Sequence, residues 1–360
     1  MTAGRPGVRP SMSLMVRGRR RFHAVAALVG AAGLLAGCTT ATPAPMPSPT
    51  PSYTSDYETP APVVLAPLTG VAVDDPASLA HPSLAAKIDN HWDARPQVGL
   101  QYTDLVFEEL VEGGLTRYVA VWHSNIPAEI GPIRSIRPMD PDIISPFGGI
   151  VAYSGGQQRF VQLMRSTNVY NAIHGQSDTA DVMYRTKDKD APHNVIVKAP
   201  ELIAMHTDIA PPPQQYAYAD EPGGATAARE GAVVAGVDLV FGGSSHPSWR
   251  WDAASARWLR TQMGEVDLDS AGAQLSAVNV VIVRVPVSND GGVPKTELVG
   301  GGEAWVLSGG GMVHASWSKP DRTTPIRLVD DTGAVIRLAP GNSWFELVPN
   351  SGSVTQVPAA

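Results

Sequence analysis

The sequence predicts an α+β protein, in which a mixed, layered N-terminal α/β domain is followed by a mostly β C-terminal domain. Strand patterns and helix patterns alternate between residues 67 and 208, and elements intermixed in this way are typical of layered α/β or α+β folds. Short β-branched runs separated by Gly, Pro and Asp then follow between residues 237 and 356. Such runs indicate a sandwich or a barrel-like unit.

The first 37 residues predict a lipoprotein signal peptide. Arginines precede an apolar run from Phe22 to Leu35, which ends in Leu-Ala-Gly before Cys38, the only cysteine of the chain. An apolar run of about 14 residues is shorter than the roughly 20 of a membrane-spanning helix, and the whole pattern is typical of a cleaved secretory signal. We therefore expect acylation of Cys38 and a location outside the cytoplasm, anchored to the cell membrane. Arg19 to Phe22 also fits a twin-arginine signal, so the export route stays open.

Two Pro-rich segments divide the rest of the chain. Residues 38–66 consist largely of Thr, Ala, Pro and Ser, which cannot bury enough surface to fold and predict an extended tether. Residues 209–236 combine a run of three prolines with Gly- and Ala-rich sequence, and we place a linker there. The predicted folded domains are therefore 67–208 and 237–356.

The charge balance excludes general binding to nucleic acid. The chain has 27 basic and 34 acidic residues, but six arginines and no acidic residues lie in the first 37 positions, which leaves 21 basic residues against 34 acidic ones. A net charge of −13 repels polyanions, so an anion site must be a local cluster of cations. Acylation of Cys38 would leave no thiol for a disulfide, a zinc-thiolate site or a nucleophile.

Several motifs resemble those of the YerB-like envelope lipoproteins. They are Lys87-Ile-Asp-Asn90, Glu112-Gly-Gly-Leu-Thr-Arg117, Ile130-Gly-Pro-Ile-Arg-Ser-Ile-Arg-Pro138, Ser154-Gly-Gly156, Ala191-Pro-His-Asn194, Asn279 to Val283, and Leu338-Ala-Pro-Gly-Asn-Ser-Trp344. The resemblance covers nearly all of residues 67–350. It implies a mixed layered fold of sheets with helices on one side. It carries over no catalytic residues, because this is a family of unknown function.

Three arginines predict a binding site for an anion. Arg117 follows a Gly-Gly turn, and Arg134 and Arg137 lie in a segment that two prolines hold extended. Guanidinium groups are planar forks that suit phosphate or carboxylate oxygens. The turn at Ser154, Gly155 and Gly156 leads into a predicted helix, whose first N–H groups also attract anions. The alternative, with equal weight, is that the arginines pair with neighbouring glutamates in a structural network.

Three carboxylates are spaced by four residues, at Asp104, Glu108 and Glu112. This spacing places them on one side of either a strand or a helix, and hard cations such as Mg²⁺ or Ca²⁺ bind such oxygens. A divalent-cation site is therefore conceivable, although we favour a polar strand face in water. No other cofactor is predicted.

A histidine ends the charged loop at residues 185–193. His193 could move a proton or orient a ligand, whereas a hydrogen-bonded structural role is the interpretation that we favour. His91, His123 and His174 have no partner at metal-ligand spacing in the sequence, which argues against a zinc site.

Two hypotheses about function follow. In the first, the protein is a non-catalytic binding or scaffold protein, whose arginines hold an anionic group of a cell-wall polymer, a polyprenyl phosphate or an envelope protein. In the second, it is an envelope phosphoryl or glycosyl-phosphoryl transferase that uses the arginines and a carboxylate-bound Mg²⁺. The second rests on a short, gapped similarity of Thr116-Arg117, Arg134 to Arg137 and Ala152 to Gly156 to the LytR-CpsA-Psr transferases. A transferase should bring a carboxylate within a few ångströms of the arginines.

Overall fold

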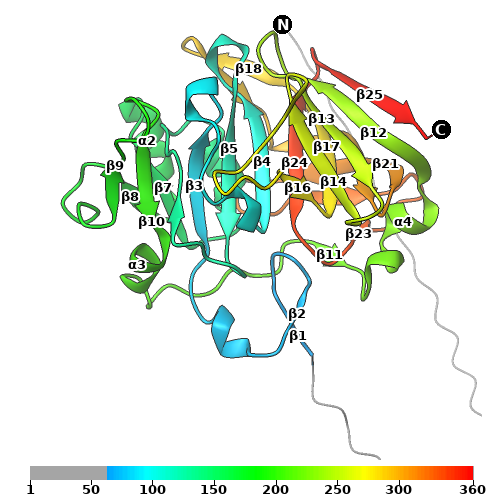
Figure 1. The fold of residues 1–360 in the computed structure, drawn as a ribbon, viewed down its shortest axis with the longest axis horizontal. Coiled ribbons are helices and arrows are strands. Elements are labelled where there is room, and N and C mark those ends of the chain that lie inside the picture. Colours follow the sequence, from blue (N-terminus) through cyan, green and yellow to red (C-terminus); the bar gives the residue numbers. More distant parts are fainter. Residues whose placement is uncertain (1–62, 360) are drawn as a thin grey trace, which may run out of the picture. The chain divides into compact units, whose positions relative to one another are not determined.

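One mixed β-sheet runs through the computed structural model of the protein, which describes residues 63–359 (Figure 1). The predicted signal peptide, Cys38 and most of the predicted tether lie outside the described residues. From one edge of the sheet to the other, its path runs through β15 (Glu265–Val266), β14 (Arg257–Gln262), β13 (Pro247–Asp252), β12 (Ala232–Val240), β21 (Gly311–Lys319), β20 (Gly300–Ser308), β17 (Asn279–Val285), β24 (Ser343–Pro349), β4 (Leu105–Leu110), β5 (Thr116–Trp122), β3 (Leu84–Asp89), β7 (Ile150–Tyr153) and β8 (Tyr170–Ile173).

The remaining elements are short. Three strands pair beside the main path, namely β16 (Ser276–Ala277), β22 (Arg327–Val329) and β25 (Ser353–Pro358). Smaller sheets contain β1 (Val64–Leu65), β2 (Ala72–Val73), β6 (Glu129–Ile130), β9 (Met183–Arg185), β10 (Val195–Lys198), β11 (Ala217–Tyr218), β18 (Val287–Asp290), β19 (Val293–Thr296) and β23 (Arg337–Leu338). The α-helices are α1 (Asp140–Ile144), α2 (Gln158–Arg165), α3 (Ala199–Ala204) and α4 (Thr226–Glu230). The 3-10 helices are η1 (Pro76–Leu79), η2 (Trp92–Ala94), η3 (Leu100–Tyr102), η4 (Glu112–Gly114) and η5 (Pro222–Gly224). The described chain is therefore rich in strands and poor in helices, which is compatible with the predicted α+β class.

A strand from near the C-terminus joins the two predicted domains. β24 pairs in parallel with β17 on one side and with β4 on the other, so that Phe345 lies opposite both Val281 and Phe107. The rings of Phe107 and Phe345 stack with their centroids 4.7 Å apart. The two predicted domains thus share one sheet, and the position of the boundary between them stays a prediction.

The segment predicted as a linker carries structure of its own. It contains β11, η5, α4 and the first residues of β12. Tyr216 and Tyr218 are 8% and 6% exposed and belong to the hydrophobic core. The Pro-, Gly- and Ala-rich composition predicted a linker because it gave no weight to these two tyrosines. Their burial removes enough apolar surface from water to hold the segment against the core.

Strands β4 and β5 form the hairpin that the sequence predicts. η4 connects them, and Gly113 and Gly114 both have positive φ angles. A side chain at Gly114 would lie 3.2 Å from the backbone of Gly243, so glycine is needed there for space as well as for conformation. Both strands are buried along almost their whole length, as expected for central strands that are covered on both faces.

Candidate functional site

The three predicted arginines converge at the end of the β3–β5–β4 sheet segment. Arg117 of β5 lies directly opposite Asp89 of β3 and Glu109 of β4, and directly opposite side chains share one face of a sheet. The extended segment that carries Arg134 runs beside β3, because the Arg134 N–H donates to the Lys87 carbonyl at 2.7 Å. This backbone contact places Arg134 and Arg137 close to Arg117.

A shared carbonyl shows how close these guanidinium groups are. Nη1 of Arg117 donates to the Ser135 carbonyl at 3.1 Å, and Nη1 of Arg137 approaches the same oxygen at 3.4 Å. Burial, followed by the nearby charges of Arg137 and Arg134, lowers the pKa of Arg117 to about 10. We call Arg117, Arg134 and Arg137 the arginine cluster.

Two of the three arginines in the cluster form ion pairs with carboxylates. Nε of Arg134 lies 2.9 Å from Oδ2 of Asp89, and Nε of Arg137 donates to Oε2 of Glu112 at 2.8 Å. Within residues 63–359, no carboxylate lies within ion-pair distance of Arg117. Arg117 is therefore the member of the cluster without an ion pair of its own.

The glycine turn that the sequence singled out borders the cluster. The Ser154 N–H donates to the Arg134 carbonyl at 3.0 Å, and the Gly155 carbonyl accepts from the Ile136 N–H at 3.0 Å. Gly155 has a φ of 94°, and a side chain at this position would meet nothing within 4 Å. Gln157, the N-cap of α2, makes no side-chain capping bond. The turn therefore contacts the backbone of the arginine segment and has open space at Gly155.

A buried ionic layer lies under the arginine cluster. Nζ of Lys87 donates to Glu109 and, at 2.7 Å, to Oδ1 of Asp140, and all three side chains are fully buried. Oδ2 of Asp140 accepts the Arg137 N–H at 2.5 Å. Burial lowers the pKa of Lys87 to about 8 although Asp140 opposes this effect, while Arg117 and Arg137 add to it. The layer fixes the backbone position of Arg137.

The three carboxylates that the sequence grouped as a metal site do not gather. Asp104 precedes β4, where its Oδ2 accepts the N–H groups of His123 and Ser124, each at 2.7 Å. Burial raises the pKa of Asp104 to about 6, partly offset by these hydrogen bonds. Glu112 lies beyond the strand in η4 and pairs with Arg137. The spacing argument failed because β4 covers only the residues between these two carboxylates.

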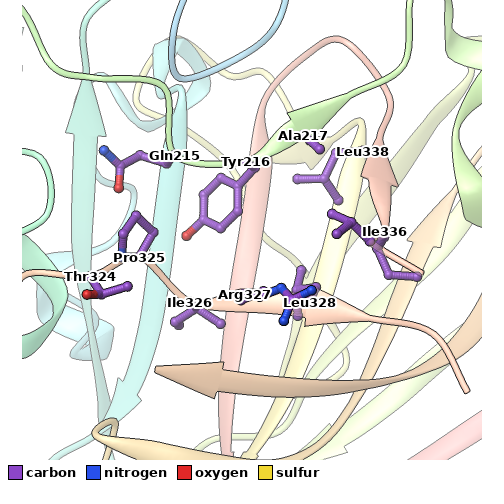
Figure 2. Close-up of a pocket in the computed structure, with 11 residues that line it drawn as sticks. Gln215, Tyr216, Ala217, Thr324, Pro325, Ile326, Arg327, Leu328, Ile336 and Leu338 are labelled. Carbon is purple, nitrogen blue, oxygen red and sulfur yellow. The ribbon is translucent and has the colours of Figure 1, made fainter. Parts of the chain in front are cut away.

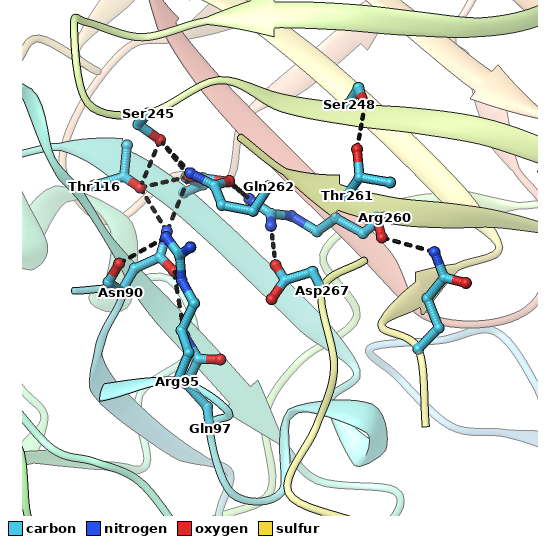
Figure 3. A network of polar contacts seen from close by, with 12 residues as sticks. Asn90, Arg95, Gln97, Thr116, Ser245, Ser248, Arg260, Thr261, Gln262 and Asp267 are labelled. Carbon is cyan, nitrogen blue, oxygen red and sulfur yellow. Dashed lines mark hydrogen bonds and ion pairs between the residues drawn. The ribbon is translucent and has the colours of Figure 1, made fainter. Parts of the chain in front are cut away.

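Glu108 is fully buried, in contrast to the polar strand face in water that we favoured. Its Oε2 accepts from Nη2 of Arg260 at 2.5 Å, and its Oε1 accepts from the Thr116 hydroxyl at 2.5 Å. Asp267 binds the other end of the Arg260 guanidinium, which is 0% exposed (Figure 3). Burial would lower the pKa of Arg260, but the charges of Glu108 and Asp267 raise it well above its usual range.

This buried network ties the two parts of the sheet together. Thr116 and Glu108 belong to β5 and β4, whereas Arg260 and Gln262 belong to β14 (Figure 3). Nη2 of Arg260 also donates to Oε1 of Gln262 at 2.9 Å. The network is closed to solvent and offers no free donor fork to a ligand.

His193 meets a carboxylate and a second histidine. Its Nδ1 lies 2.6 Å from Oδ2 of Asp89, the same oxygen that pairs with Arg134. Its ring stacks on His91, with centroids 4.5 Å apart. Asp93 completes a group in which one ligand atom from each of His91, Asp93 and His193 lies within 4.8 Å of the others. Sequence spacing could not reveal this group, because its histidines come from distant loops.

The apolar cavity in Figure 2 lies elsewhere. Its volume is about 220 Å³, and its lining includes Tyr216, Ile326, Leu328 and Ile336. No residue of the arginine cluster lines it. Its apolar lining gives no chemical reason to place a catalytic function there.

None of the helices in the described part of the chain is both long enough and apolar enough to span a membrane.

Comparisons with known proteins define the family. The family model described as "Protein of unknown function (DUF3048) N-terminal domain" matches residues 68–209, and its C-terminal counterpart matches residues 237–345. The chain belongs to this YerB-like family, as its motifs indicated.

YerB from Bacillus subtilis is similar to this chain in both sequence and structure. The protein of strain 168 named "Putative lipoprotein YerB" is 24% identical over 298 residues, which cover 79% of this chain and 86% of the relative. The crystal structure of the YerB protein from Bacillus subtilis is 21% identical and superimposes with a TM-score of 0.70, covering 81% of this chain and 99% of that one. The relative's name agrees with the predicted lipoprotein signal, and the structural likeness shows that the two proteins share a fold.

Proposed function

We propose that this protein is a lipid-anchored binding protein of the cell envelope and that its arginine cluster binds a phosphate or carboxylate group. Acylation at Cys38 would hold the folded part outside the cytoplasm. The bound group would belong to a cell-wall polymer, a polyprenyl phosphate or an envelope protein. Nucleic acid is not an expected partner, because the chain carries a strong acidic excess.

The observation that carries this proposal is the convergence of three guanidinium groups, of which Arg117 has no ion pair of its own. The Arg134 and Arg137 side chains are 19% and 12% exposed. A bound anion would lie near all three positive charges and accept hydrogen bonds from forks that suit its oxygens. The Ser154–Gly156 turn, where a side chain at Gly155 would meet nothing within 4 Å, borders this group.

Binding fits the carboxylate positions better than group transfer does. A transferase of the type considered above needs carboxylates that hold Mg²⁺ beside the arginines. Of the three carboxylates predicted to hold the metal, only Glu112 reaches the arginines and meets the distance expected of a transferase. Arg137 already binds its Oε2 at 2.8 Å, and a single carboxylate does not make the predicted set of metal ligands. Asp104 and Glu108 are engaged with the chain after β5 and with Arg260.

Calorimetric titration of the purified full chain with pyrophosphate tests the anion site. We expect one binding site in the wild type, and a loss of affinity of at least about tenfold in the double variant Arg134→Gln, Arg137→Gln, because each charge-assisted hydrogen bond contributes roughly 1.5–3 kcal/mol. Arg159→Gln is the matched control, since Arg159 is exposed on α2 and pairs with Asp290. Equal affinity in the double variant and the control would contradict the proposal.

Metabolic labelling with a clickable fatty acid tests the anchor. We expect label in the wild-type protein and none in Cys38→Ser. An unlabelled wild-type protein in the cytosolic fraction would contradict the envelope location, whatever the outcome of the titration.

A further inference from the structure

A second group of side chains contacts Asp89, next to the arginine cluster. His91 follows β3 and caps the start of η2, whereas His193 lies two residues before β10. Nδ1 of His91 accepts the backbone N–H of Asp93 at 3.2 Å and lies 3.3 Å from its Oδ2, so a metal ion bound at this nitrogen would replace the capping bond. With His193, these two residues offer three ligand atoms within 4.8 Å of one another.

Asp89 contacts the imidazole ring of His193 and the backbone of His91. It is the last residue of β3 and only 3% exposed. Its Oδ1 accepts the backbone N–H of His91 at 3.2 Å, and its Oδ2 lies 2.6 Å from Nδ1 of His193. A carboxylate beside one ring nitrogen fixes the tautomer and leaves the other nitrogen, here Nε2 of His193, free for a metal. Buried Asp89 therefore has the position of an outer-shell carboxylate.

The type of ligands indicates the type of ion. Two imidazole nitrogens and one carboxylate oxygen suit Zn²⁺ and its first-row neighbours, whereas Ca²⁺ and Mg²⁺ prefer oxygen ligands alone. Three protein ligands leave a fourth position for water or a further ligand. A polar cleft of about 490 Å³ begins at this position, lined by Asp93, His193 and the loop residues 187–191. The site is therefore accessible from solvent.

We propose that His91, Asp93 and His193 bind a divalent transition-metal ion of the Zn²⁺ class, with Asp89 as the residue that orients the His193 ring. The site goes beyond the anion binding proposed above, because none of its three ligands belongs to the arginine cluster. Asp89 contacts both, through Oδ2. A bound cation and a bound anion would thus both lie close to one buried carboxylate.

Competition with a chromogenic zinc chelator tests this site in the full chain carrying Cys38→Ser, which removes the only thiol. We expect one equivalent of bound Zn²⁺, lost in both His91→Ala and His193→Ala. His314→Ala is the matched control, because His314 also contacts two carboxylates, Asp331 at 2.6 Å and Glu303 at 3.3 Å. It should keep the full equivalent.

Two further readouts separate metal binding from a loss of fold. Asp89→Asn should weaken Zn²⁺ binding by about 10- to 100-fold, as removal of outer-shell partners usually does. Co²⁺ should give visible absorption bands in the wild type and in Arg137→Gln, and circular dichroism should show that the histidine variants are folded. No bound Zn²⁺ in the wild type, or equal binding in folded His193→Ala, would overturn the proposal.

Discussion

Two arginine sites lie on the same sheet and differ in how their charge is compensated. Arg260 is fully buried and contacts two carboxylates, Glu108 and Asp267. Arg117, Arg134 and Arg137 share two carboxylates among three side chains, and two of the three are partly exposed. In the first site the guanidinium is paired with a carboxylate at both terminal nitrogens, whereas in the second Arg117 has no ion pair of its own. We propose that this difference in pairing, more than the presence of arginine, separates a structural network from an anion site.

The comparison predicts losses of stability of very different size at the two sites. Arg260→Met should lower the free energy of unfolding by about 3–5 kcal/mol, because it leaves two buried carboxylates without a counter-charge. Arg137→Gln should cost no more than about 1 kcal/mol, since Glu112 is 40% exposed and can be solvated. Urea unfolding of both variants measures the difference. Equal losses would contradict the distinction between the two sites.

The ionic layer under the cluster predicts a pH dependence. The pKa of Lys87 is about 8 in the folded protein against an ordinary value of 10.5. The unfolded chain therefore binds more protons above pH 8, and the free energy of unfolding should rise with pH. Between roughly pH 8 and 9.5 this group adds up to about 2 kcal/mol.

Lys319 provides the matched comparison for this measurement. Burial also lowers its pKa to about 8, and it lies outside the arginine cluster. Urea unfolding at several pH values should show a smaller rise in Lys87→Met, while Lys319→Met should keep the Lys87 contribution. An unchanged slope in Lys87→Met would show that the lysine keeps its proton through its contacts with Asp140 and Glu109.

Sequence patterns were sufficient for the local elements. The Gly-Gly turn before Arg117 and helix α2, which follows the Ser154–Gly156 turn, both lie where the sequence predicts them. Arg117, Arg134 and Arg137 could be grouped because the hairpin and the Pro-flanked segment are each rigid and close in sequence. These features depend on neighbouring residues alone.

The partners of those residues could not be predicted, because they depend on the order of strands in the sheet. Glu108 and Arg260 are 152 residues apart and meet only because β24 lies between β17 and β4. His91 and His193 likewise come from loops that only the folded chain brings together. The Lys87-Ile-Asp-Asn90 motif held a signal that we did not use, since charged residues alternating in an otherwise apolar strand indicate buried ion pairs.

A smaller effect is expected when the carboxylate that pairs with Arg137 is removed. Glu112→Gln removes the carboxylate that competes for Arg137, so the affinity for pyrophosphate should rise a few-fold. Glu230→Gln is a suitable control, because Glu230 is half-exposed at the end of α4. Calorimetric titration measures both. A fall in affinity for Glu112→Gln would mean that Glu112 positions Arg137 for the ligand.

The most direct test of the account is to locate a bound anion. Crystals of the protein soaked in tungstate should show an anomalous difference peak between the guanidinium groups of Arg117, Arg134 and Arg137, beside the Ser154–Gly156 turn. The same soak of Arg134→Gln, Arg137→Gln should show none there. Tungstate bound only at other places on the wild-type protein, or nowhere, would contradict the claim that the arginine cluster is an anion site.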